Sequence, residues 1–157
     1  MRKVELPVVN RSCGECRKCC EGWLSASIYG KFMSKGQPCY YLGDGCTIYE
    51  ERPEEPCRKY ECMWIESEVF PMWMKPSVSG VIVTRRVVEG SGVLYYTVLE
   101  AGRKIESSVL NWVVQWALGT QSNIHYEVGG KSYMIGSSEF ISLMNRDVSG
   151  VSKRESV

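Results

Sequence analysis

The chain has 157 residues, of which 44% are hydrophobic and 24% are charged, and its formal net charge is +1 at pH 7. This hydrophobic content is too high for a disordered chain, and the length suits one compact domain or two small lobes. The balanced charge gives no general attraction to nucleic acid or anionic lipid, and no apolar run is long enough to span a membrane. We therefore expect neither nucleic acid nor a membrane as a partner.

All eight cysteines lie within the first 62 residues. They open with a C-x-x-C-x-x-C-C run and continue at wider spacing: Cys13, Cys16, Cys19, Cys20, Cys39, Cys46, Cys57 and Cys62. Cysteines two residues apart on a tight turn can bind one metal ion, and a triple run is closer to iron–sulfur spacing than to an isolated zinc pair. The pattern predicts a metal centre, in which the eight thiols could form two four-thiol sites, or one site with the remaining thiols left for other duties.

Disulfides or redox-active thiols are the alternative to a metal centre. The chain begins with Met-Arg-Lys-Val-Glu-Leu, which lacks the apolar core of a signal peptide. We therefore expect a cytoplasmic, reducing setting, in which clustered thiols usually bind metals.

Six basic residues lie within a few positions of the cysteines: Arg11, Arg17, Lys18, Arg52, Arg58 and Lys59. They could form a nucleic-acid patch or offset the negative charge of thiolates around a metal. Glutamates interleave with them and the whole chain is balanced, so we favour local charge compensation.

The segment 10–65 is predicted to be a cysteine-cluster region with too few aliphatic residues to fold by burial alone. Bound metal can supply the missing stability. Leu24, Ile28 and Phe32 recur at four-residue steps, which predicts a short helix. Residues 36–38 and 43–45 are predicted to be loops that carry Cys39 and Cys46. Residues 63–76 are rich in Met and Trp and form either a binding groove or, as we favour, a hydrophobic lid between the two lobes.

Residues 66–146 are predicted to form an antiparallel β-β-α-β-β-α lobe, which makes the fold class α+β. Strands at 81–88 and 93–99 read as one hairpin, and strands at 124–128 and 131–135 flank a Gly-Gly turn. A helical stripe runs from Ile105 to Trp116 with Gly119 as its expected C-terminal cap, and Ser137 can cap a last short helix through Met144. Residues 147–157 are polar and predicted to be a flexible tail.

The second lobe offers little chemistry. Its His125 is the one histidine of the chain and lies on a predicted strand, where we expect a structural role. No catalytic triad, zinc-protease motif, phosphate loop or dinucleotide fingerprint is present in the sequence. We therefore predict no catalytic residues outside the cysteines, and no turnover by the isolated protein.

The cysteine segment also resembles a known family. The run CGECRKCC, the Pro38-Cys39 pair, GCTIYEERP from Gly45 to Pro53, and CRKYEC from Cys57 to Cys62 are similar to the YkgJ-type cysteine-cluster family. That family is described as a zinc- or iron-chelating domain, and a related cluster occurs in flagellin lysine methylases. The resemblance covers roughly residues 10–65 and implies that all eight cysteines are metal ligands. It implies framework roles for Tyr49, Arg52, Pro53 and Tyr60.

The cysteine spacing does not decide which metal is bound. An iron–sulfur cluster, which we favour, and zinc held by thiolates alone are both compatible with it. Eight thiols exceed the need of one four-cysteine site, and Cys19 and Cys20 are too close in sequence to bind one ion together. We expect a structural or electron-transfer role, with an unknown protein partner possible. The alternatives are a structural zinc protein that acts as an interaction module, a metal store, and a redox or group-transfer enzyme related to the flagellin methylases.

Overall fold

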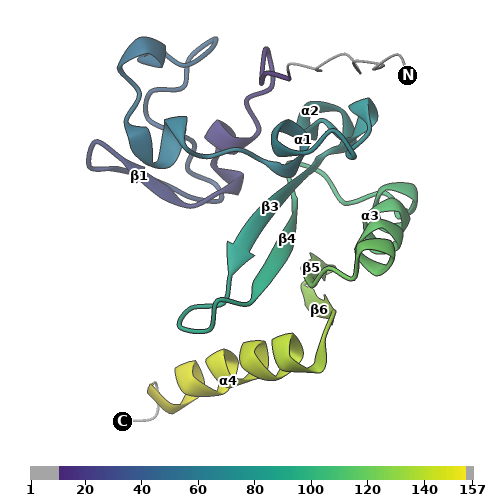
Figure 1. Cartoon of the computed structure of the whole chain (residues 1–157). Coiled ribbons are helices and arrows are strands. Elements are labelled where there is room, and N and C mark those ends of the chain that lie inside the picture. Colours follow the sequence, from purple (N-terminus) through teal and green to yellow (C-terminus); the bar gives the residue numbers. More distant parts are fainter. Residues whose placement is uncertain (1–10, 155–157) are drawn as a thin grey trace, which may run out of the picture.

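Residues 11–154 are described by a computed structural model, with side chains as far as Arg146. The fold is mixed α+β, with a two-stranded sheet followed by a four-stranded sheet and helices (Figure 1). The strands are β1 (Ala26–Ile28), β2 (Lys31–Met33), β3 (Val81–Val87), β4 (Leu94–Glu100), β5 (Ile124–Val128) and β6 (Lys131–Ile135). The α-helices are α1 (Met63–Glu66), α2 (Pro76–Ser79), α3 (Ser107–Thr120) and α4 (Ser138–Arg154). Short helical turns lie at Cys19–Trp23, Tyr49–Glu51, Glu54–Arg58 and Met72–Met74.

The cysteine region, defined here as residues 11–62, consists mostly of turns and loops around the β1–β2 hairpin. The helix predicted from Leu24, Ile28 and Phe32 is wrong. Tyr29 and Gly30 both have positive φ, at 48° and 75°, and they form the tight turn that reverses the chain between the two strands. The predicted loops at 36–38 and 43–45 are present and lead into Cys39 and Cys46.

The order of elements after residue 80 is β-β-α-β-β-α, as predicted, and the strand order in the sheet is β3-β4-β5-β6. The sheet is not wholly antiparallel, however, because β4 and β5 pair in parallel. The connection between them runs through α3, whose 14 residues return the chain to the end of the sheet from which β4 starts. Gly129 and Gly130 both have positive φ and form the predicted β5–β6 turn.

Two helix ends differ from the predictions. Gly119 lies inside α3, and the left-handed residue that ends this helix is Gln121, at φ 54°. Ser137 caps α4 as expected, since its Oγ accepts the Phe140 amide at 3.1 Å. The helix then continues to Arg154, so residues 147–154 are helical where a polar tail was predicted; residues 155–157 lie outside the described part of the chain. None of the described helices is both long and apolar enough to cross a membrane.

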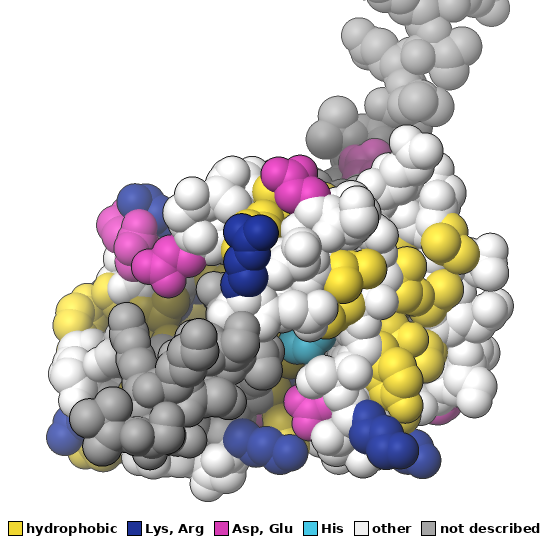
Figure 2. Space-filling model, turned by 90° about the horizontal axis from the view of Figure 1, so that it is seen from below, with side chains coloured by type: hydrophobic (Ala, Val, Ile, Leu, Met, Phe, Trp, Pro, Cys, Tyr) yellow, Lys and Arg dark blue, Asp and Glu magenta, His cyan; other side chains and the backbone are white. Residues whose placement is uncertain are grey.

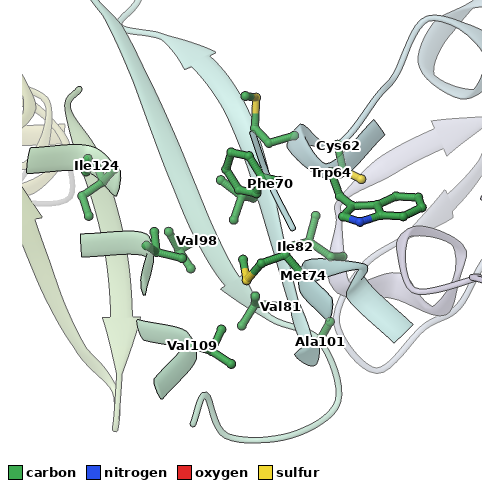
Figure 3. Close-up of a cluster of buried hydrophobic side chains, with 14 of the residues drawn as sticks. Cys62, Trp64, Phe70, Met74, Val81, Ile82, Val98, Ala101, Val109 and Ile124 are labelled. Carbon is green, nitrogen blue, oxygen red and sulfur yellow. The ribbon is translucent and has the colours of Figure 1, made fainter. Parts of the chain in front are cut away.

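A single cluster of buried side chains joins the two predicted regions (Figure 3). Val81, Ile82 and Val98 line the sheet, α3 contributes Val113, and Phe70 packs edge-on against two tryptophans of that helix. The 63–76 segment supplies Met63, Trp64, Phe70 and Met74 to this core, which matches a lid more than a groove. Met72 and Trp73 remain exposed at its surface.

Candidate metal centre

All eight cysteines are free thiols; Cys62 is buried, Cys13 is exposed and the other six are half-buried. Among the residues that the structure describes, no group of three or more Cys, His, Asp or Glu side chains stands close enough to hold a metal ion as placed. The thiols are therefore gathered in one region without being closed around an ion. Metal binding would have to draw them together.

Four thiols whose charges act on one another's pKa values are called here the inner set: Cys13, Cys16, Cys19 and Cys62. A tight turn, closed by a 2.9 Å hydrogen bond from the Cys16 amide to the Cys13 carbonyl, carries the first two. Arg11 holds this turn beside the Cys62 segment, because its guanidinium donates to the Trp64 carbonyl at 2.7 Å. Burial raises the pKa of Cys19, and the charges that Cys62, Cys20, Cys13 and Cys16 would carry as thiolates raise it further. Burial also raises the pKa of Cys62, with Cys13 and Cys16 adding to the effect.

The other four thiols form the outer set: Cys20, Cys39, Cys46 and Cys57. The Cys39 amide donates to the Cys20 carbonyl at 2.9 Å, and Leu42 links the loop by donating to the Cys39 carbonyl at 3.0 Å and pairing with Cys46. Burial raises the pKa of Cys20 to about 11, and the thiolate charges of Cys39, Cys46 and Cys57 contribute to this rise. Burial, together with Cys39 and Cys46, raises the pKa of Cys57 in the same way.

The two sets divide a pair of sequence neighbours. Cys19 packs against the hydrophobic core, whereas the thiols that act most on Cys20 belong to the outer set. Cys13 also lies near enough to raise the pKa of Cys20, so the two sets are adjacent. Although Cys13 is exposed as a residue, the packing around its thiol raises its pKa. The Cys20 charge also acts on Cys19, so the expectation that Cys19 and Cys20 do not share an ion stays a prediction.

Hydrogen-bond donors surround the inner set. The backbone N–H groups of Trp64 and Ile65 interact with the Cys62 side chain, where they partly offset the effect of burial on its pKa. Tyr60 lies between Cys19 and the sheet, with its hydroxyl 2.8 Å from the Thr84 hydroxyl on β3. Burial and then the Cys19 charge raise the pKa of Tyr60, which therefore stays a protonated donor. Donors of this kind stabilise thiolate sulfur in metal sites.

Arg52 acts electrostatically on one cysteine of each set. Its Nε donates to the Tyr49 carbonyl at 2.8 Å and its guanidinium stacks 3.6 Å from the centre of the Tyr49 ring. Its positive charge partly offsets the rise in the pKa of both Cys13 and Cys57. Lys75, which the sequence analysis did not single out, has the same effect on Cys13 and forms an ion pair with Glu15 at 2.9 Å.

The other basic residues of the cysteine region hold its loops. The Arg17 guanidinium donates to the Gly43 carbonyl at 2.8 Å, and Arg58 donates to the Arg52 carbonyl at the same distance. Lys18 and Lys59 pair with nearby glutamates. The partners in these contacts are carbonyls and glutamates, so the predicted compensation of thiolate charge by these four cations stays a prediction.

A polar cavity of about 280 Å³ lies beside the inner set. Its lining comes from the end of the cysteine region, α1 and β3, and comprises Lys59, Tyr60, Glu61, Glu66, Thr84 and Arg85. Arg85 and Glu66 form an ion pair on its wall. The two cations and two carboxylates of the lining therefore balance in charge.

His125 lies outside both sets. It is on β5, in register with Thr97 of β4 and Met134 of β6. Figure 2 shows part of the imidazole at the surface of the face viewed there. With no cysteine in the four-stranded sheet, the expected structural role is consistent with this position.

The thiols are chemically suited to a metal centre, because cysteine thiolates are ligands of both tetrahedral zinc and iron–sulfur clusters, although the described side chains are not placed around an ion. Comparison of the chain with protein-family models, with curated proteins and with solved structures found no match.

Proposed function

We propose that the protein binds metal through cysteine thiolates, with an iron–sulfur cluster as the favoured cofactor and a structural or electron-transfer role. The observation that carries the proposal is the gathering of eight free thiols within residues 13–62, where the charges of several of them act on the pKa values of the others. The amide donors beside Cys62 and the two cations near Cys13 suit thiolate ligands rather than neutral thiols. The resemblance to the YkgJ-type family supports the same proposal.

Zinc is the alternative cofactor, since a four-thiolate shell with amide hydrogen bonds serves either metal. A closed shell of cysteine ligands leaves no open position for bond chemistry, which favours a structural or electron-transfer role over catalysis.

The test is anaerobic purification of the untagged chain, followed by a visible spectrum and analysis of iron, zinc and acid-labile sulfide. We expect brown protein that contains iron and sulfide; colourless protein with stoichiometric zinc would select the alternative. Protein without either metal, and with four disulfides, would refute metal binding altogether.

A pair of variants connects the metal to its proposed ligands. Cys62→Ser should lower metal content, because Cys62 is the buried thiol and the backbone amides of Trp64 and Ile65 partly offset the rise in its pKa. His125→Asn, on β5 of the four-stranded sheet, is the control and should retain wild-type metal. Equal losses in both variants would show that metal retention depends on the general stability of the chain.

A further inference from the structure

We infer that a second, smaller cavity, at the junction of the cysteine region and the four-stranded sheet, is a binding site for a tetrahedral oxyanion: phosphate or sulfate, free or at the end of a monoester. Its volume is about 90 Å³, and its lining comprises Lys18, Ser77, Gly80, Ala101, Gly102 and Arg103. No cysteine lines it, so the site does not require bound metal.

The lining of this cavity is positively charged. Its ionisable side chains are the Lys18 ammonium and the Arg103 guanidinium, and no carboxylate belongs to the lining. The 280 Å³ cavity beside the inner set differs, because two carboxylates balance its two cations. Guanidinium and ammonium groups are the side chains that bind phosphate oxygens through charge-assisted hydrogen bonds. The smaller cavity therefore favours an anion.

Both cations have a glutamate neighbour outside the lining, and donors remain on each. Lys18 pairs with Glu21 at 3.1 Å, which occupies one N–H group of the ammonium. Arg103 donates to the Val78 carbonyl and lies 3.9 Å from Glu106, and both contacts use Nη2. The hydrogens on Nε and Nη1 are left for other acceptors. These pairs hold the two head groups in place without using up their donors.

The backbone of the lining adds further donors. Gly102 has φ 98°, and neither its amide nor that of Arg103 donates to another of the described residues. Consecutive N–H groups at a bend of this kind can form a concave anion-binding arrangement. The ammonium is close to this bend, because an added Cβ on Gly102 would lie 3.6 Å from Lys18 Nζ. An oxyanion there can contact the ammonium and the amides together.

The size and position of the cavity restrict the ligand and its effect. A volume of about 90 Å³ suits a tetrahedral ion but not a nucleoside, so any ester group would extend into solvent. Lys18 belongs to the cysteine region, whereas Gly80 and Gly102 flank β3 and β4. A bound anion would therefore link the two regions and, by binding the folded chain, raise its stability.

Titration of the full chain, as purified, with inorganic phosphate tests the site. Ionic strength is held constant with chloride, and binding is followed by calorimetry. Lys18→Gln and Arg103→Gln should each weaken the affinity at least about tenfold, through loss of a charge-assisted contact. Lys35→Gln and Arg86→Gln are the matched controls, because they remove the same charges at exposed positions outside the cavity. They should change the affinity by less than about twofold, since solvent and salt screen them.

A second measurement needs no variant. In the NMR spectrum of the wild-type chain, phosphate and sulfate should move the amide resonances of Lys18, Gly102 and Arg103 most. Those of Gly129 and Gly130, in the β5–β6 turn, should stay in place. Glycerol 3-phosphate distinguishes the sources of the anion: the same shifts mean that a monoester is accepted, and shifts with inorganic phosphate alone restrict the ligand to the free ion.

Several results would overturn the oxyanion site. Absence of binding at millimolar phosphate would do so directly. Equal shifts with chloride, or equal losses of affinity in Lys35→Gln and Arg86→Gln, would show that phosphate only screens surface charge. Neither measurement reads metal content, so failure of this site and failure of the proposed metal centre are distinguishable.

Discussion

The cysteine region and the four-stranded sheet use different means to stay folded. The sheet, α3 and the 63–80 segment enclose a continuous apolar core, from Phe70 and Met74 to Val113 and Ile124, all 2% exposed or less. In the cysteine region the buried apolar side chains are few: Leu24, Ile28, Met33 and Cys62. Its two strands have three residues each, and the rest is turns. Burial therefore accounts for the second part, while the first depends on constraints from outside its own core.

The two regions meet through the shared hydrophobic core, to which Leu24 and Cys62 belong, and through specific polar contacts. Tyr60 meets Thr84 through a hydroxyl pair at 2.8 Å, and Arg11 reaches the carbonyls of Trp64 and Ser67 at 2.7 and 3.1 Å. Cys62 is the thiol that shares the sheet's hydrophobic core. Loss of the proposed metal should therefore disorder the cysteine region before it disorders the four-stranded sheet.

Metal removal should produce the largest difference between the two regions. Structural metal sites contribute roughly 10–16 kcal/mol, which exceeds the whole stability of a typical domain. We expect chelation under reducing conditions to abolish amide protection across residues 13–62, while β3, β4 and α3 keep most of theirs. Hydrogen exchange read by mass spectrometry measures both at once.

Two results would contradict this comparison. If β3 and β4 lost protection as fully as residues 13–62, the sheet would depend on the metal and the two regions would form one folding unit. If residues 13–62 kept their protection after chelation, their loops would be stable without metal.

The elements that could be predicted from the sequence are those set by local chemistry. Alternating β-branched strands and Gly-rich turns define the β3–β4 and β5–β6 hairpins, because the turn residues fix the pairing. Leu24, Ile28 and Phe32 show where this reasoning fails. Their spacing suits a helix, but Tyr29 adopts a positive φ that few non-glycine residues take, and the chain turns back at Gly30. The parallel β4–β5 pair depends on how α3 packs, which local signals do not encode.

For the candidate site, the sequence identifies the thiols but not how they group. Cys19 and Cys20 are neighbours in sequence, and only the fold shows that one packs on the core and the other lies beside Cys39. Thr84 and Lys75 come from distant segments and carry no motif. The amide donors at Trp64 and Ile65 are backbone groups, which no pattern of side chains reveals.

The Phe70→Ala substitution should lower the stability of the four-stranded sheet and α3, and leave the cysteine region unchanged. The ring is 1% exposed and packs between Trp112 and Trp116, with centroid distances of 5.1 and 4.9 Å. Removing such a buried ring costs roughly 3–5 kcal/mol, because it leaves a cavity that neighbours fill only in part. Denaturant unfolding followed by tryptophan fluorescence should show this loss, while metal content per folded molecule stays at the wild-type value. Loss of metal in folded Phe70→Ala protein would mean that the core also orders the cysteines.

The Gly22→Ala substitution should instead destabilise the cysteine region. Gly22 has φ 95°, and a Cβ there would overlap the Ser34 carbonyl and lie 2.9 Å from the Gln37 carbonyl. Left-handed backbone alone costs a non-glycine residue about 1–3 kcal/mol, and the Cβ overlap adds to that cost. We expect weaker metal retention, with protection of β3 and β4 unchanged. Gly30→Ala is the control, since it shares a positive φ but has open space at its Cβ; equal effects would assign the whole cost to φ.

The smallest expected effect lies farthest from the cysteines, at the start of α4. The Ser137 hydroxyl accepts the Phe140 amide at 3.1 Å, so Ser137→Ala leaves one amide of the first turn without its partner. Loss of such a cap costs about 0.5–2 kcal/mol. Ser138→Ala, one residue further along and inside the helix, should change stability by less than about 0.5 kcal/mol. Exchange of the α4 amides should rise in the first variant alone, with metal content unchanged in both. A loss of metal in Ser137→Ala would show that α4 supports the cysteine region through the sheet, and the two regions would then have to be treated as one.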